Sequence, residues 1–291
     1  MSSGRAVRVQ RPVPLSVSGR GAGRLRRLGL LLLLPVALSG CVSEQREQEL
    51  GDVIATDINS RVPLVRDPIL NAYVSLLGSQ LVQVSGRPNL DYRFYIINSA
   101  MVNAFALPGG HIYLTRGLIA RTQNPDELAA VLAHEVGHVA ARHGIQKLQR
   151  HLRTGSLMSV LYHLILGGEP AILQQNALHM AGVIWSARHS RRDEMEADRL
   201  AVRYLHRAGG DPSAIISLLE TLLQEEAQDT GGVANWFSTH PHTAERIRHT
   251  RSRVEEKEAE ASPAREMEVA SYDLFRRRLM RLPPPPDVDL Y

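Results

Sequence analysis

The chain is poor in cysteine, lysine and long apolar runs. Cys41 is the only cysteine among 291 residues, so an internal disulfide framework is excluded. The apolar run at 28–38 is about half of the ~20 residues that a helix needs to span a bilayer, which argues against a permanent transmembrane segment there. Only Lys147 and Lys257 are lysines, so arginine carries nearly all of the positive charge.

The formal net charge of +4 is unevenly distributed along the chain. Residues 1–40 contain seven arginines and no acidic residue, and setting them aside leaves 27 of the 34 basic residues against 30 acidic ones. The remainder is therefore mildly acidic, and no basic face for nucleic acid is expected. A chain of this length with 44% hydrophobic residues can bury one substantial core, so we expect one domain with extensions.

The first forty residues have the pattern of an export signal. Basic residues at 24–27 precede the apolar run, and Leu38-Ser39-Gly40-Cys41 follows it. This ending resembles the lipobox of bacterial lipoproteins, which implies cleavage before Cys41 and attachment of lipid to its thiol. An ordinary cleaved signal with an unrelated cysteine is the alternative. Val42, rather than Asp, in the next position favours the outer membrane over the inner membrane or the free periplasm.

Apolar periodicity and turn residues predict a mixture of helices and short strands. Strands are expected at 92–97, 103–106 and 111–115, which together predict a small antiparallel sheet. Asn124, Pro125 and Glu127 predict the start of a helix that runs to about residue 148, because they supply an N-cap, a first-turn proline and a capping glutamate. Other helical patterns cover 43–84, 157–165, 171–207 and 212–226, and 255–268 is a charged helix or linker.

One pentapeptide inside the helix that begins near Asn124 carries chemistry. It reads His134-Glu135-Val136-Gly137-His138. Four residues are slightly more than one helical turn, so both imidazoles leave the same face and can bind one metal ion. Glu135 lies beside them, placed to accept a proton from an attacking water. Gly137 is a poor helix residue, which weakens a purely structural explanation of this stretch.

A catalytic zinc needs a third protein ligand, and the best candidate follows at Arg191 to Asp198. Glu194 and Asp198 are four residues apart and share a helix face, so Glu194 can reach the metal while Asp198 accepts an N–H from a ligating histidine. Glu196 points elsewhere. The alternative is that these acids pair with neighbouring arginines on a solvated surface.

Four motifs stand in order along the chain. They are Asn103 to Gly110, His134 to His138 continuing into Arg142-His143, Ser190-Arg191 with Glu194 to Asp198, and Ser238-Thr239-His240-Pro241. Together they resemble one family of zinc metallopeptidases, which includes the CAAX prenyl protease, bacterial heat-shock membrane proteases and BepA-type periplasmic proteases. The resemblance covers about 48–254, and one departure is His189, where the family usually has an aromatic residue.

The resemblance implies an α+β, mainly helical, zincin-like metallopeptidase with an active-site helix, a small antiparallel sheet and a second ligand-bearing helix. It implies one Zn²⁺ per chain held by His134, His138 and Glu194, with Glu135 as general base and Asp198 orienting a ligand. The expected organisation is a lipoprotein signal at 1–40, a metallopeptidase domain at 41–255 and a charged, proline-rich tail at 256–291.

Two further assignments concern the substrate side of the site. Asn103, Ala104, Phe105 and Ala106 are expected to form the edge strand to which an extended substrate adds by main-chain pairing, and plain core β-structure is the alternative. In BepA-like proteases a histidine in the loop of His240 can occupy the fourth zinc position and exclude the catalytic water. His240 is therefore expected to gate activity, and stabilisation of the oxyanion is the rival role.

The function that the resemblance and the export signal imply is an envelope endopeptidase that degrades misfolded or misassembled outer-membrane and periplasmic proteins. The expected partners are such substrates and the membrane, reached through the lipid anchor, and no nucleic acid. The competing function is an assembly or chaperone factor with a latent zinc site. Only some forty residues follow Arg251, too few for the helical repeats through which a docking array would bind partners.

Overall fold

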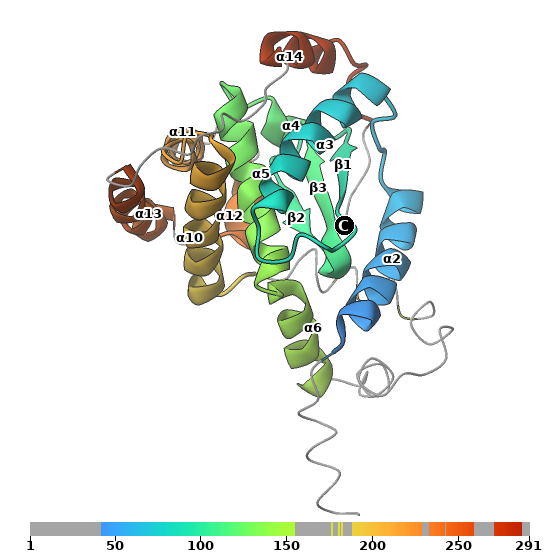
Figure 1. The fold of residues 1–291 in the computed structure, drawn as a ribbon. Helices are drawn as coiled ribbons and strands as arrows, with labels where there is room; N and C mark the ends of the chain where they lie inside the picture. Colours follow the sequence, from blue (N-terminus) through green and yellow to red (C-terminus); the bar gives the residue numbers. More distant parts are fainter. Residues whose placement is uncertain are drawn as a thin grey trace, which may run out of the picture. The chain divides into compact units, whose positions relative to one another are not determined.

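The computed structural model describes residues 42–154, 176, 180, 182, 188–228, 233–241, 243–258 and 271–286 (Figure 1). The strands are β1 (Arg93–Ile97), β2 (Ala104–Ala106) and β3 (His111–Thr115), with the 3-10 turn η1 (Pro108–Gly110) between β2 and β3. The helices are α2 (Glu44–Arg61), α3 (Pro68–Gln83), α4 (Arg116–Ile119), α5 (Pro125–Ala140), α6 (His143–Thr154), α10 (Arg191–Ala208), α11 (Ala214–Ala227), α12 (Ala234–Thr239), α13 (Thr243–Glu258) and α14 (Tyr272–Met280).

The three strands form one sheet in the order β1-β3-β2. β2 and β3 are antiparallel, joined by the short turn that the sequence predicts, whereas β1 runs parallel to β3. The sheet is therefore mixed, which corrects the expectation of a wholly antiparallel one. The reason is the connection at 98–103, which leads the chain from β1 to the far side of the sheet, where β2 runs in the opposite direction. β3 then turns back between β1 and β2 and so runs parallel to β1.

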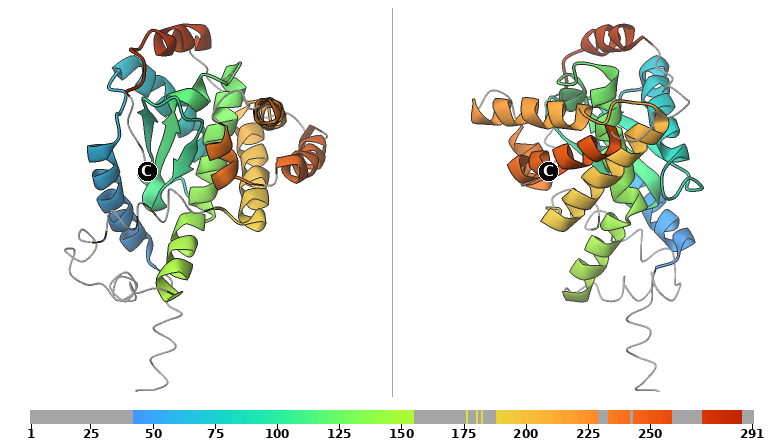
Figure 2. Two further views of the ribbon diagram at one scale, coloured as in Figure 1. Left: turned by 180° about the vertical axis from the view of Figure 1, so that it is seen from behind. Right: turned by 60° about the vertical axis from the view of Figure 1, so that its left-hand side comes forward.

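Side chains of the sheet alternate between two apolar clusters, as the two-residue period of a strand requires. Ile96, Ala104 and Ile112 face the cluster built with α3 and α5, while Phe105 and Tyr113 face the cluster built with α2. Figure 2 shows the consequence, with α2 on one side of the sheet and α5 and α10 on the other.

The helical pattern predicted at 43–84 is two helices in the structure. Asp67 caps α3 through hydrogen bonds from the backbone of Ile69 and Leu70, and Pro68 stands at the first helical position. The segment between α2 and α3 instead follows the outer edge of β1, where Val65 donates to the carbonyl of Ile96 at 2.8 Å. A short stretch of extended chain therefore covers this edge of the sheet.

α5 begins where the sequence predicts but ends earlier. The Asn124 side chain accepts from the Glu127 backbone N–H, and Glu127 accepts in return from Gln123 at 2.8 Å. The helix does not reach residue 148, because Arg142 adopts a left-handed conformation with φ 60° and α6 starts in a new direction at His143. Contacts with Val42 and Glu47 of the N-terminal segment hold Arg142 in this conformation.

α5 and α10 cross closely, and Gly137 lies at the crossing. A Cβ at this position would lie 3.1 Å from the carbonyl oxygen of Ala197, so even an alanine would require the backbone of α10 to shift by a few tenths of an ångström. α10 is fixed at its start by a reciprocal capping box between Ser190 and Asp193, and it ends at left-handed Gly209. This crossing brings the acidic motif of α10 against the histidine motif of α5.

The C-terminal part of the described chain returns to the α3 side of the fold. Within the segment expected as a tail, Phe275 of α14 stacks on Tyr73 of α3 with ring centroids 4.2 Å apart. Arg116 donates hydrogen bonds to the carbonyls of Leu282 and Pro283, at 3.1 and 2.5 Å. The helices predicted at 157–165 and over most of 171–187 lie outside the described residues. Among the helices that the structure describes, none is long and apolar enough to cross a membrane.

Candidate metal centre

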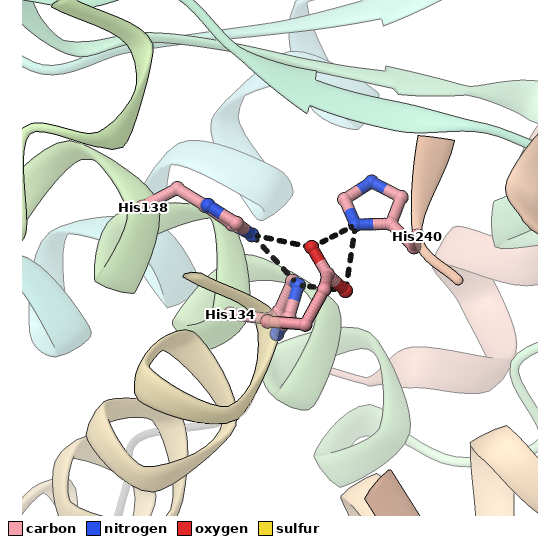
Figure 3. Close-up of side chains that lie close together, drawn as sticks. His134, His138 and His240 are labelled. Carbon is pink, nitrogen blue, oxygen red and sulfur yellow. Dashed lines mark hydrogen bonds and ion pairs between the residues drawn. The ribbon is translucent and has the colours of Figure 1, made fainter. Parts of the chain in front are cut away.

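α5, α10 and the end of α12 bring four potential metal ligands to one buried point. His134 and His138 come from α5, Glu194 from α10, and His240 from the residue that follows α12 (Figure 3). One ligand atom of each residue lies within 4.8 Å of the others, and all four side chains are buried. Residues 106 positions apart along the chain therefore converge, as the motifs implied.

The separations between these atoms suit one tetrahedral ion. Nε2 of His134 and Nε2 of His138 are 3.0 Å apart, and Glu194 lies 3.3 Å from His138 and 3.7 Å from His134. Ligands at zinc bond lengths of 2.0–2.1 Å stand about 3.3 Å apart in a tetrahedron. Nδ1 of His240 is 3.2 Å from both oxygens of Glu194. Nitrogen and carboxylate donors at these spacings fit one zinc ion.

Asp198 and Arg246 surround the ligands with a second set of charges. Oδ1 of Asp198 lies 2.9 Å from Nδ1 of His134, on the side of the ring opposite the cluster. Arg246 of α13 binds both oxygens of Asp198 at 2.8 Å and reaches Glu194 at 2.7 Å. Burial alone would raise the pKa of Asp198, but Arg246 and His134 lower it to about 2.

Glu194 is ionised by the same neighbours. Burial opposes its charge, yet Arg246 and then His240 outweigh burial and hold the pKa of Glu194 well below its ordinary value. His240 responds in the opposite sense: burial favours its neutral form, but Glu194 outweighs burial and raises the pKa of His240. The cluster thus contains a carboxylate anion ready to bind a cation.

Glu135 differs from every other acid in the site. It is 1% exposed, and neither carboxylate oxygen has a hydrogen-bond partner among the described residues. Nε2 of His240 lies 3.8 Å from Oε1 of Glu135. Burial raises the pKa of the Glu135 carboxyl above its ordinary value. A buried carboxylate without a partner is costly, so its place beside the cluster suggests a task in proton transfer.

His240 also contacts the edge of the sheet. Its Nε2 lies 3.3 Å from the carbonyl oxygen of Ala104 in β2, and its ring stacks on Trp236 with centroids 4.4 Å apart. Thr239, one residue earlier, donates to the side chain of Asn103 at 3.3 Å. The loop that carries His240 is therefore attached to the strand expected to receive substrate.

β2 is an edge strand, and its side chains belong to the core. Asn103, Ala104 and Phe105 are each at most 5% exposed, so their main-chain groups are covered as well as their side chains, and the carbonyl of Ala104 is in contact with His240. Thr115 donates to the carbonyl of Asn103 on the β3 side, and in an antiparallel ladder the carbonyl of the next residue, Ala104, points away from β3.

Two residues that sequence reasoning did not single out belong to this site. Arg246 lies on the face of α13 that also buries Thr250 and Val254. The four-residue spacing of these three positions was the feature of the sequence that could have indicated a buried arginine. His143 was noted only as part of a motif, and its Nδ1 lies 2.9 Å from Nδ1 of His138.

His189, the departure from the family pattern, packs its ring 4.1 Å from that of His138. Cys41 lies outside the described residues.

Comparison with known proteins agrees with this geometry. The model of peptidase family M48 matches residues 68–254, which includes every residue of the cluster. This chain belongs to peptidase family M48. Its members are metallopeptidases, and the buried cluster of three histidines and Glu194 is compatible with the single zinc ion expected from the sequence.

Individual relatives are named as proteases or metalloendopeptidases. The chain is 29% identical over 248 residues to the beta-barrel assembly-enhancing protease of Yersinia pestis, covering 83% of this chain and 50% of the relative. The protein of that name from Escherichia coli K12 is 30% identical over 220 residues, covering 72% and 44%. The mitochondrial metalloendopeptidase OMA1 of Schizosaccharomyces pombe is 31% identical over 194 residues, covering 67% and 55%. The chain therefore spans about half the length of the curated relatives it matches.

Proposed function

We propose that this M48 chain is a zinc-dependent endopeptidase of the bacterial cell envelope. The observation that carries the proposal is the carboxylate of Glu135, buried beside the cluster with neither oxygen hydrogen-bonded to any residue that the structure describes. A purely structural zinc site does not need such a group. Hydrolysis does, because a base must take the proton of the attacking water.

In this proposal His134, His138 and Glu194 hold the zinc, which when bound supplies a Lewis acid for the scissile carbonyl. Asp198, whose Oδ1 lies 2.9 Å from Nδ1 of His134, holds the orientation of that ring by charge, and Arg246 neutralises the excess acidic charge. Glu135 takes a proton from water and passes it to the leaving amine. Once His240 has moved away from the carbonyl of Ala104, the outer edge of β2 binds an extended substrate through its main chain, which requires little sequence specificity.

The decisive experiment compares Glu135→Gln with Glu196→Gln. Glutamine at 135 keeps the shape of the side chain and all proposed ligands but cannot accept the proton, so zinc content should equal that of the wild type while casein digestion is abolished. Glu196 lies on α10 as Glu194 does, but its side chain is 39% exposed and lies outside the cluster. Its variant should retain both properties. Near-normal digestion by Glu135→Gln would refute the catalytic assignment.

The envelope location and the substrates belong to the same proposal. The lipobox-like sequence at Cys41 supports an outer-membrane lipoprotein facing the periplasm, and the names of the bacterial relatives support misassembled outer-membrane proteins as substrates. Cys41→Ser, expressed with its signal, should no longer incorporate labelled palmitate and should leave the membrane fraction or stay unprocessed. Normal labelling and membrane retention would remove the lipoprotein assignment.

A second candidate function rests on His240. With its Nδ1 3.2 Å from Glu194 and its side chain buried, His240 can complete a four-ligand shell that has no position for water. Such a closed site is latent, and the chain could then act mainly as an envelope assembly factor. The two functions are compatible if a substrate or partner displaces His240 and thereby opens the site.

A further inference from the structure

The two α5 histidines of the cluster have different partners behind them. The second nitrogen of His134 lies 2.9 Å from the carboxylate of Asp198. His138 faces the cluster through Nε2 and directs its Nδ1 to another imidazole, that of His143, at 2.9 Å. His143 is 2% exposed and stands at the first residue of α6. No carboxylate among the described residues contacts Nδ1 of His138.

The proton positions along this pair follow from the metal. A nitrogen that binds zinc carries no proton, so His138 with Nε2 in the cluster must carry its proton on Nδ1. Nδ1 of His143, 2.9 Å away, is then the acceptor. A neutral His143 consequently carries its own proton on Nε2. That nitrogen lies 3.9 Å from the largely buried carboxylate of Asp193, which favours a proton there, and 3.6 Å from Glu196, whose partly exposed carboxylate is screened by solvent and contributes little.

We propose that His143 is the positioning residue of His138, holding its ring and its tautomer through an imidazole-to-imidazole hydrogen bond, as Asp198 does for His134. The inference rests on the proposed function, since it requires His138 to be a zinc ligand. Partners of this kind raise metal affinity by about 10–100-fold because they remove the rotational and tautomeric freedom of the ligand.

His143 is itself held in place by the N-terminal segment. Arg142, whose left-handed conformation turns the chain from α5 into α6, donates to the carbonyl of Val42 at 2.5 Å. Its Nε lies 2.9 Å from the buried carboxylate of Glu47, which also pairs with Arg87 at 3.0 Å. Val42 and Glu47 precede the region that matches family M48. The support of a proposed zinc ligand therefore extends into a part of the chain outside the family match.

The test measures zinc affinity by competition with a chromophoric chelator for wild type, His143→Leu, His143→Asn and His111→Ala. Leucine fills the space without an acceptor, whereas the asparagine oxygen can replace Nδ1 of His143. His111 is a matched control: it is also 2% exposed and bonded through both ring nitrogens, to Asp52 and Tyr95, but it lies on β3 away from the cluster.

We expect His143→Leu to weaken zinc binding about 10–100-fold and His143→Asn to recover most of the loss. His111→Ala should lower stability and leave zinc affinity unchanged. Wild-type affinity in folded His143→Leu, or equal losses in the leucine and asparagine variants, would overturn the proposal. Failure of the wild type itself to bind zinc would instead refute the proposed function.

A measurement on the unaltered protein keeps the inference testable if the variants do not fold. In the zinc-loaded wild type, long-range ¹H–¹⁵N correlation spectra of the histidines should show His138 protonated at Nδ1 and His143 protonated at Nε2. Protonation of neutral His143 at Nδ1 would rule out a hydrogen bond donated by Nδ1 of His138 to Nδ1 of His143, whatever the variants show.

Discussion

Arg246 offers the sharpest test of the electrostatics around the metal centre. The side chain is 1% exposed and pairs with Asp198 and Glu194, themselves 3% and 0% exposed. Arg246→Met keeps most of the volume and removes the charge, which leaves two buried carboxylates without their cation. Breaking a buried pair in this way costs about 3–5 kcal/mol.

The cost of protonating an unpaired carboxylate leads to a similar loss of unfolding free energy for Arg246→Met. A carboxyl group left without its cation can take up a proton instead, and at pH 7 this costs about 4 kcal/mol for an ordinary pKa near 3.9. Protonation therefore limits the loss per carboxylate. In the wild type the pKa of Asp198 is lowered to about 2, so its contribution is present above pH ~4 and is lost as the pH falls toward 2. The difference between wild type and variant should accordingly shrink as the pH is lowered from 7.

The assay is equilibrium urea denaturation of the zinc-free protein, with Arg251→Met as the control. Arg251 lies on the same helix and pairs with Glu220 at 2.9 Å, but both side chains are about half exposed. An exposed pair contributes about 0–1 kcal/mol, so the control should be nearly neutral. Equal losses for the two variants, or a loss at Arg246 that grows toward acid pH, would refute the reasoning.

Further predictions concern the ligands themselves. Glu194→Ala should lose both zinc and proteolysis, while Glu196→Ala should keep both; loss of zinc from the second variant, measured by metal analysis, would show that the ligand register on α10 is wrong. His240→Ala should keep zinc and raise basal casein turnover if His240 closes the site, with His242→Ala as a neighbouring control. A fall in turnover at His240 with zinc intact would select the oxyanion role instead.

Local chemistry made much of the fold predictable. The capping residues at Asn124 fixed the start of α5, and the alternating segments around Pro108 gave the β2–β3 pair. The spacing of His134 and His138 placed two imidazoles on one helix face, and the motif order implied Glu194 as their partner. Each of these features depends on residues within a turn or two of one another, or on a family pattern.

Features that depend on distant parts of the chain were not predictable. Periodicity continues through Arg142, and the break there is maintained by Val42 and Glu47, about a hundred residues earlier. The parallel pairing of β1 with β3 follows from the path of a connection whose residues carry no signal of direction. Arg246 resembles any arginine of a charged helix until the fold places it between two buried acids.

The two edges of the sheet have consequences for how fast a peptide can bind. The outer edge of β1 is covered by the backbone of residues 63–65, which is hydrogen-bonded to it on both sides of Leu64. At the opposite edge, the carbonyl of Ala104 lies 3.3 Å from Nε2 of His240. An extended peptide can pair there only after this imidazole has left. Binding of the peptide to β2 should then be limited by the opening of the loop that carries His240. Its rate should therefore level off as the peptide concentration rises, instead of increasing in proportion to it.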